Sequence, residues 1–81
     1  MDRQEIIERV NGIIIKTLGV EKDAVKESAS FDSDLYADSL DHVEIVMGVE
    51  RSFGISITDK EAETLRTVGD IYDFVEKKCV I

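Results

Sequence analysis

The residues of this sequence that could do chemistry gather around one serine. Ser39 stands in the stretch "YADSLDHVEIV", with Asp38 before it and Asp41 and His42 within the next helical turn. Serine, histidine and aspartate together are the components of a hydrolytic triad. A triad also needs an oriented base, an oxyanion hole and a pocket, and the sequence has no GxSxG turn. We therefore interpret His42 as an ordinary surface histidine and expect no catalytic residue here.

The surrounding acids raise the possibility of a calcium site. The stretch "DSDLYADSLDHVE" begins like an EF-hand loop, with Asp32 and Asp34 at the first and third positions. Tyr36 then occupies the fifth ligand position, Ala37 replaces the required glycine, and Val43 stands where a bidentate glutamate belongs. No Cys/His spacing suggests zinc, and no glycine-rich loop suggests a nucleotide. The sequence predicts no specific metal site, and loose binding of divalent ions by the aspartates stays open.

The position of Ser39 favours a phosphate group. One residue past an N-cap at Asp38, it lies where backbone N–H groups are unpaired and the helix dipole is positive. A phosphodiester on the hydroxyl would be partly neutralised there. An ordinary first-turn serine fits the same position, so both interpretations remain open on position alone.

Composition and charge limit the partners of the chain. Its formal net charge is −8, and residues 32–63 contain nine acids against Arg51 and Lys60, a net of −7. This charge argues against nucleic acid or an anionic membrane as the main partner. Its concentration predicts a docking surface for basic partners, with solubility as the alternative interpretation.

Length and residue content predict one domain, residues 1–81, located in the cytoplasm. The longest apolar run is "III" at 13–15, and the first residues, "MDRQEIIERV", are too charged for a signal peptide. We therefore expect no insertion into a membrane. A single cysteine, Cys79, cannot form an intramolecular disulfide, which agrees with a reducing compartment such as the cytoplasm.

Helices are the elements that must position Ser39. The first is expected over Arg3–Leu18, with Asp2 and Glu5 resembling a capping box and Gly19 as the stop. The second is expected from the N-cap Asp38 to about Ser52. Its inward-facing residues are expected to be Leu40, Val43, Val46, Met47 and Phe53, with Asp41, Glu44 and Glu50 toward water. Gly48 lies inside this helix, where glycine is unfavourable, and the sequence gives no evident reason for a glycine there.

A long connection and two further helices complete the expected all-α fold. Residues 20–38 are expected to form a loop pinned to the core by Val25, Phe31 and Leu35. A short helix is expected in "TDKEAETL", where Thr58 and Glu61 make a capping box. The last helix is expected after Thr67, with its inner face formed by Val68, Ile71, Val75 and Cys79. The prediction is a four-helix bundle, three longer helices and one short one, with a long loop between the first and second.

The stretch "ADSLDHVEIVMGVERSFGISITDKEAETLRTVGDIYDFVEK" resembles the acyl carrier proteins of fatty-acid synthesis. The specific features are "DSLD" followed by "VEIVM", Phe53 at a helix end, and "TVGD" opening the last helix. The resemblance covers about Glu5 to Lys78. It implies a carrier that is not an enzyme, whose motif serine, Ser39, bears 4′-phosphopantetheine moved from coenzyme A by a separate phosphopantetheinyl transferase (holo-acyl carrier protein synthase). The thiol of that arm, and not Cys79, would hold acyl chains as thioesters.

The resemblance also implies which residues meet partners and cargo. The helix over residues 39–52 would face fatty-acid synthesis enzymes with basic docking patches, in a chain expected to act as a monomer. The implied docking residues are Asp38, Leu40, Asp41, Val43, Glu44, Met47 and Glu50. The implied lining of an acyl cavity, equally the expected core, is Val46, Ile57, Ala62, Leu65 and Ile71.

Three departures from the family pattern bear on the type of carrier. Relatives often have a run of acids after "VM", but this chain has Arg51 and Ser52 in that stretch. Tyr36 stands where glycine is common, and Thr58 stands where proline is common. None of the three touches the attachment chemistry. Two alternatives to the main fatty-acid carrier stay open. One is a specialised carrier of polyketide or aminoacyl intermediates. The other is an unmodified acidic helical module, in which Ser39→Ala would be silent.

Overall fold

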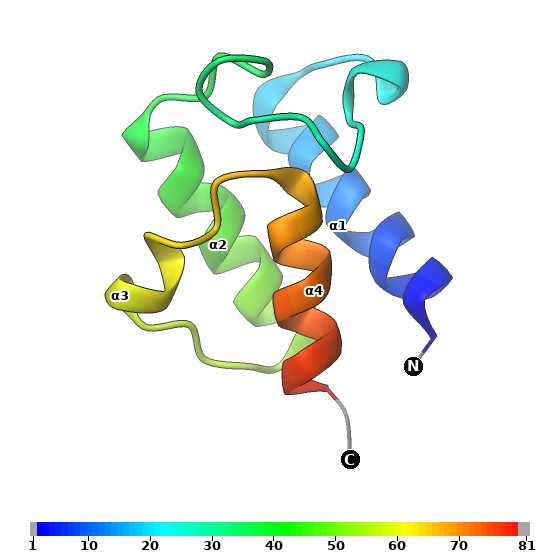
Figure 1. The fold of residues 1–81 in the computed structure, drawn as a ribbon, viewed down its shortest axis with the longest axis vertical. Coiled ribbons are helices and arrows are strands. Elements are labelled where there is room, and N and C mark those ends of the chain that lie inside the picture. Colours follow the sequence, from blue (N-terminus) through cyan, green and yellow to red (C-terminus); the bar gives the residue numbers. More distant parts are fainter. Residues whose placement is uncertain (1, 80–81) are drawn as a thin grey trace.

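The computed structural model describes residues 2–79, and within them the fold is all-α (Figure 1). The helices are α1 (Arg3–Leu18), α2 (Ser39–Phe53), α3 (Asp59–Ala62) and α4 (Val68–Lys78), with a single 3₁₀ turn at Lys22–Ala24. α1 packs against both α2 and α4, while short α3 lies in the connection between α2 and α4. The predicted four-helix fold and its long loop between α1 and α2 are confirmed.

Side-chain caps explain where the helices begin. Asp38 accepts a hydrogen bond from the backbone N–H of Asp41 at 2.8 Å, and the Asp41 carboxylate accepts from the Asp38 N–H at 3.3 Å. The predicted capping box of Thr58 and Glu61 at α3 is confirmed. At α1, Asp2 is the N-cap and accepts the Glu5 N–H at 2.9 Å, but only this half of the predicted capping box is formed. Each cap satisfies backbone donors that have no partner inside the helix.

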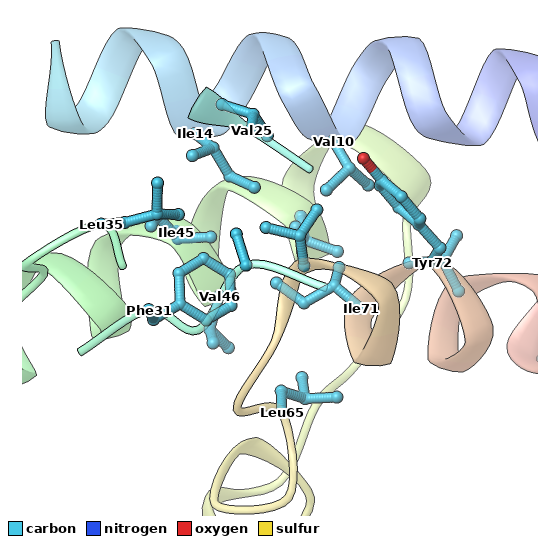
Figure 2. Packing of buried hydrophobic residues seen from close by; sticks show 14 of the residues in the cluster. Val10, Ile14, Val25, Phe31, Leu35, Ile45, Val46, Leu65, Ile71 and Tyr72 are labelled. Atoms are coloured by element: carbon cyan, nitrogen blue, oxygen red, sulfur yellow. The ribbon is translucent and has the colours of Figure 1, made fainter. Parts of the chain in front are cut away.

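The core is formed by α1, α2, α4, the long loop and the connections on either side of α3 (Figure 2). Ile6, Val10 and Ile14 of α1 are fully buried. The three predicted loop anchors are also buried, so the loop is pinned to the core as expected. The buried side chains outside α1 are Val25, Ala29, Phe31, Leu35, Ala37, Ile45, Val46, Val49, Ile57, Leu65, Val68, Ile71, Tyr72 and Val75.

The expected inward face of α2 is wrong at three positions. Leu40, Val43 and Met47 are 68%, 51% and 47% exposed, whereas Ile45 and Val49 are fully buried. Apolar residues follow helical spacing on two faces of this helix, so periodicity alone does not identify the face that packs inward. Of the other two expected residues, Val46 is buried and Phe53 is partly buried.

Backbone hydrogen bonds hold the long loop against the start of α4, and at one point the two backbones come very close together. Gly69 lies where an added Cβ would be 2.9 Å from the backbone oxygen of Glu27. Three backbone hydrogen bonds join the two segments: Gly69 N–H to Glu27 O at 2.8 Å, Val68 N–H to Ala29 O at 3.0 Å and Phe31 N–H to Arg66 O at 3.0 Å. The loop is therefore an ordered part of the fold despite its length.

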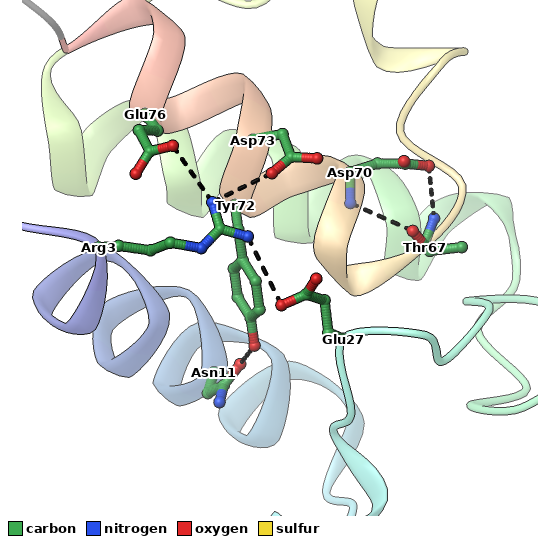
Figure 3. Close-up of polar contacts among 8 residues, drawn as sticks. All are labelled: Arg3, Asn11, Glu27, Thr67, Asp70, Tyr72, Asp73 and Glu76. Atoms are coloured by element: carbon green, nitrogen blue, oxygen red, sulfur yellow. Dashed lines mark hydrogen bonds and ion pairs between the residues drawn. The ribbon is translucent and has the colours of Figure 1, made fainter.

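Arg3 joins the same loop to both terminal helices (Figure 3). Its guanidinium lies 3.5 Å from Glu27, 3.1 Å from Asp73 and 3.3 Å from Glu76. It also stacks 5.8 Å from the centre of the Tyr72 ring. The hydrogen bond to Asp73 and the nearby carboxylates raise the pKa of Arg3 above its ordinary value. Since the group is partly exposed, the ion pairs orient the elements more than they stabilise them.

Gly48 is explained by a close approach of α1 and α2. A Cβ added at Gly48 would lie 2.9 Å from Cγ2 of Ile13, a branched side chain with little rotamer freedom. Gly12 is also inside a helix, but a Cβ added there meets nothing within 4 Å. The two interior glycines therefore differ in what surrounds them.

We predict opposite effects of alanine at these two glycines. Gly12→Ala should raise the free energy of unfolding by about 0.5–1 kcal/mol, because alanine favours helix. Gly48→Ala should lower it by about 1 kcal/mol or more, because overpacking against Ile13 exceeds that gain. Urea titrations followed by circular dichroism measure both. Equal stabilisation by the two substitutions would contradict the close contact.

Candidate functional site

Ser39 is the first residue of α2 and is exposed. The capping box of Asp38 and Asp41 fixes the turn on which it stands. Within residues 2–79 no hydrogen bond engages the Ser39 hydroxyl. The hydroxyl is therefore presented to solvent at the positive end of a 15-residue helix.

A groove of about 630 Å³ opens beside Ser39. Three segments form it: the loop before α2, the first turns of α2, and α3 with the residues after it. The lining residues are Ser30, Phe31, Asp32, Ala37, Asp38, Ser39, His42, Val43, Asp59, Ala62, Glu63, Leu65 and Arg66. Buried Phe31 and Leu65 make part of the wall apolar, while the charged residues are exposed.

His42 is a structural part of this groove, which corrects its interpretation as a surface histidine. Its Nε2 lies 2.8 Å from the backbone oxygen of Leu65, so that nitrogen carries the proton and donates. The ring also meets Phe31 edge-on, with centroids 5.5 Å apart. His42 is half-buried and links α2 to the segment that follows α3.

The expected cavity residues separate into two groups. Ala62 and Leu65 line the groove, whereas Val46, Ile57 and Ile71 are buried but do not line it. Sequence reasoning missed Ala37, His42 and Arg66 as lining residues. Ala37 and Arg66 stand in the connecting segments on either side of the groove, where helical periodicity gives no information about the direction of a side chain.

The expected docking residues lie mainly on the outer face of α2. Glu44, like the apolar Leu40, Val43 and Met47, is exposed. Glu50 differs, because it is half-buried and its carboxylate accepts the Ile57 N–H at 2.8 Å. That carboxylate is used to hold the connection between α2 and α3, so the expectation that it faces water freely is wrong.

Comparisons with known proteins decide the family. Residues 8–75 match the family model described as the phosphopantetheine attachment site. Over 78 residues the chain is 47% identical to an acyl carrier protein of Thermosynechococcus vestitus (strain NIES-2133 / IAM M-273 / BP-1), covering 96% of each sequence. This chain belongs to the acyl carrier protein family. The alternative carrier of polyketide or aminoacyl intermediates is not favoured by these findings.

The cofactor of an acyl carrier protein is 4′-phosphopantetheine, and the site fits it. The hydroxyl at the start of α2 is accessible, as a covalent attachment requires. The helix end favours the negative charge of a phosphodiester. The groove beside it offers apolar side chains from Phe31, Val43 and Leu65 along which a flexible arm can lie.

Three further findings concern the rest of the described residues in this acyl carrier protein. No helix within residues 2–79 is long and apolar enough to cross a membrane. In the same part of the chain, no three His, Cys, Asp or Glu side chains gather as a metal-binding group. Cys79 is a free, partly buried cysteine near the end of the described residues.

We predict that His42→Ala lowers the free energy of unfolding by about 1–3 kcal/mol, because the Leu65 carbonyl loses its donor. His42→Gln should lose less, because its amide can still donate to that oxygen. Urea unfolding of the three proteins at one pH gives the comparison. An Ala variant as stable as the unsubstituted protein would show that the bond does not stabilise the groove.

Proposed function

We propose that Ser39 carries the 4′-phosphopantetheine arm and that the chain presents acyl thioesters to the enzymes of fatty-acid synthesis, with no catalysis of its own. The observation that carries the proposal is the exposed Ser39 hydroxyl at the start of α2, beside a groove with apolar walls. When bound, the arm supplies a thiol that forms thioesters with acyl groups. The partial positive charge of the helix end supports a phosphodiester at this residue.

The attachment step needs no base from this chain. The Ser39 oxygen forms a new P–O bond, the diphosphate bond of coenzyme A breaks, and the nucleotide leaves. The serine proton passes to a base of the transferase. This division of labour agrees with the role of His42, whose Nε2 is occupied by the Leu65 carbonyl.

The proposed docking surface consists of Asp38, Leu40, Asp41, Val43, Glu44, Met47 and Glu50, most of which lie on the outer face of α2. Between residues 27 and 50 the chain has seven acids and no lysine or arginine. Basic patches on the transferase and on synthesis enzymes would therefore be steered to this face. Glu44 is the acid best placed to act there, since Asp41 and Glu50 also hold backbone N–H groups. We propose that the protein acts as a monomer in the cytoplasm.

The groove is the proposed shelter for the arm and the first part of an acyl chain. Its apolar walls include Ala62 and Leu65, two of the residues that the family resemblance implies. The other three, Val46, Ile57 and Ile71, lie in the core and would be reached by a chain that enters between the helices.

We expect one phosphopantetheine to be gained when the protein is incubated with coenzyme A and a broad-specificity phosphopantetheinyl transferase. Intact mass spectrometry measures the gain, and Ser39→Ala should show none. A folded sample without any gain would contradict the proposal and favour the unmodified acidic module. A gain in the Ala variant would place the arm on another residue.

We expect Glu44→Lys to lower kcat/KM for the transferase by roughly 3- to 10-fold at low salt, because a like charge then faces the basic patch. The effect should shrink at about 0.5 M salt, where charges are screened over short distances. Glu8→Lys is the matched control, since Glu8 is exposed on α1 and the charge change is identical. Equal effects of the two substitutions would show that total charge acts, and not the docking surface.

A further inference from the structure

The large apolar side chains that are most exposed within residues 2–79 all belong to one 12-residue segment. They are Tyr36 at 83%, Leu40 at 68%, Val43 at 51% and Met47 at 47%. Helical spacing places the last three on one face of α2. Ser39 lies between the first two, so exposed apolar side chains flank the attachment residue on both sides in the sequence. Exposed apolar side chains that cluster in this way mark interaction sites.

Tyr36 is held outward by the residues on both sides of it. Leu35 and Ala37 are buried, at 5% and 9% exposure. The Leu35 N–H donates to the Ser30 oxygen at 3.0 Å, and the Ala37 N–H donates to the Phe31 oxygen at 2.7 Å. With both neighbours anchored inward, the side chain between them points to solvent.

The backbone at Tyr36 is strained. Its φ is +55°, the left-handed region, and no other residue but glycine in the described part of the chain has a positive φ. That conformation is unfavourable for a residue with a Cβ, and glycine or asparagine adopts it more readily. The fold alone would therefore prefer another residue at this position, because an exposed ring adds little to the core.

Short hydrogen bonds within the loop that carries Tyr36 hold its backbone in place. The Ser30 N–H donates to the Asp34 carboxylate at 2.7 Å, and the Ser30 hydroxyl donates to Asp32 at 2.6 Å. The bond from the Ser30 hydroxyl is the main cause of a lowered pKa of Asp32. The backbone beneath the ring is thus fixed before any partner arrives, which reduces the entropy lost on binding.

We propose that Tyr36 is an aromatic anchor for docking, which extends the apolar strip of α2 to the N-terminal side of Ser39. The occupant is a basic partner enzyme that offers an apolar recess beside the entrance of its active site. Charge supports this choice, because the strip is bordered by Asp38, Asp41 and Glu44 with no lysine or arginine between residues 27 and 50. The inference rests on the proposed function, since an enzyme that acts on Ser39 must approach within three residues of the ring.

A tyrosine ring that becomes buried when a partner docks suits this task. Tyrosine is enriched among the few interface residues that dominate binding, because it buries a large area and has few rotatable bonds. The acids on α2 act at longer range and chiefly set the rate of encounter. Tyr36 would act after encounter, by filling a recess, and its contribution should not depend on salt.

The test compares Tyr36→Asn and Tyr36→Phe with the unsubstituted apo-protein as substrates of the phosphopantetheinyl transferase from the same organism. Asparagine removes the ring and tolerates the left-handed backbone, while phenylalanine keeps the ring and the strain. We expect Tyr36→Asn to raise KM for the carrier about 5- to 30-fold with kcat retained, at low salt and at about 0.5 M salt alike. Tyr36→Phe should stay within about twofold. The Tm of the Asn variant should equal or exceed that of the unsubstituted protein.

Each contrary outcome has a distinct meaning. A KM within about twofold for Tyr36→Asn, with normal gain of phosphopantetheine, would overturn the anchor and leave the proposed function standing. A lower Tm in the Asn variant would also overturn it, because the ring would then serve the fold. No gain in the unsubstituted protein would overturn the proposed function and the anchor together.

Discussion

The attachment of the long loop to the start of α4 is the constraint on which the site depends. Backbone bonds from Phe31 and Val68 hold it there, and Gly69 allows the close approach. Without that attachment, the residues before Ser39 would be a long flexible connection, and one wall of the groove would be missing. Arg3 adds an ion-pair link from α1 to the same loop and to α4. The exposed serine is therefore positioned by contacts outside its own helix, and two of the residues that make them, Phe31 and Arg66, line the groove beside it.

The acidic surplus is compatible with a folded chain because much of it has a local use. Asp38 and Asp41 cap α2, and Glu61 caps α3 while it pairs with Lys78 at 3.4 Å. A hydrogen bond from the Thr58 backbone N–H is the main cause of the lowered pKa of Glu61. Carboxylates at helix starts are favoured by the helix dipole, so these charges stabilise the ends of helices.

Local signals in the sequence predict much of this fold, and long-range contacts account for the errors. Caps, a glycine stop and helical spacing give α1 correctly, and three apolar residues identify the loop as anchored. The inner face of α2 could not be predicted, because its apolar residues occupy two faces and only the position of α1 selects between them. The role of Gly48 depends on Ile13, and that of His42 depends on Leu65, each far away in the chain. Ser39 could be proposed from the sequence because its signal is a local motif.

The two apolar faces of α2 explain why charge and apolar contact occur together in this protein. One face, with Ile45 and Val49, is used by the core, and the other, with Leu40, Val43 and Met47, remains exposed. An exposed apolar strip favours self-association as readily as docking. The acids beside the strip oppose the approach of a second copy, which carries the same charge, and attract a basic surface. The concentration of negative charge around Ser39 therefore fits both interpretations given above, solubility and the proposed docking surface for basic partners, and the two do not exclude each other.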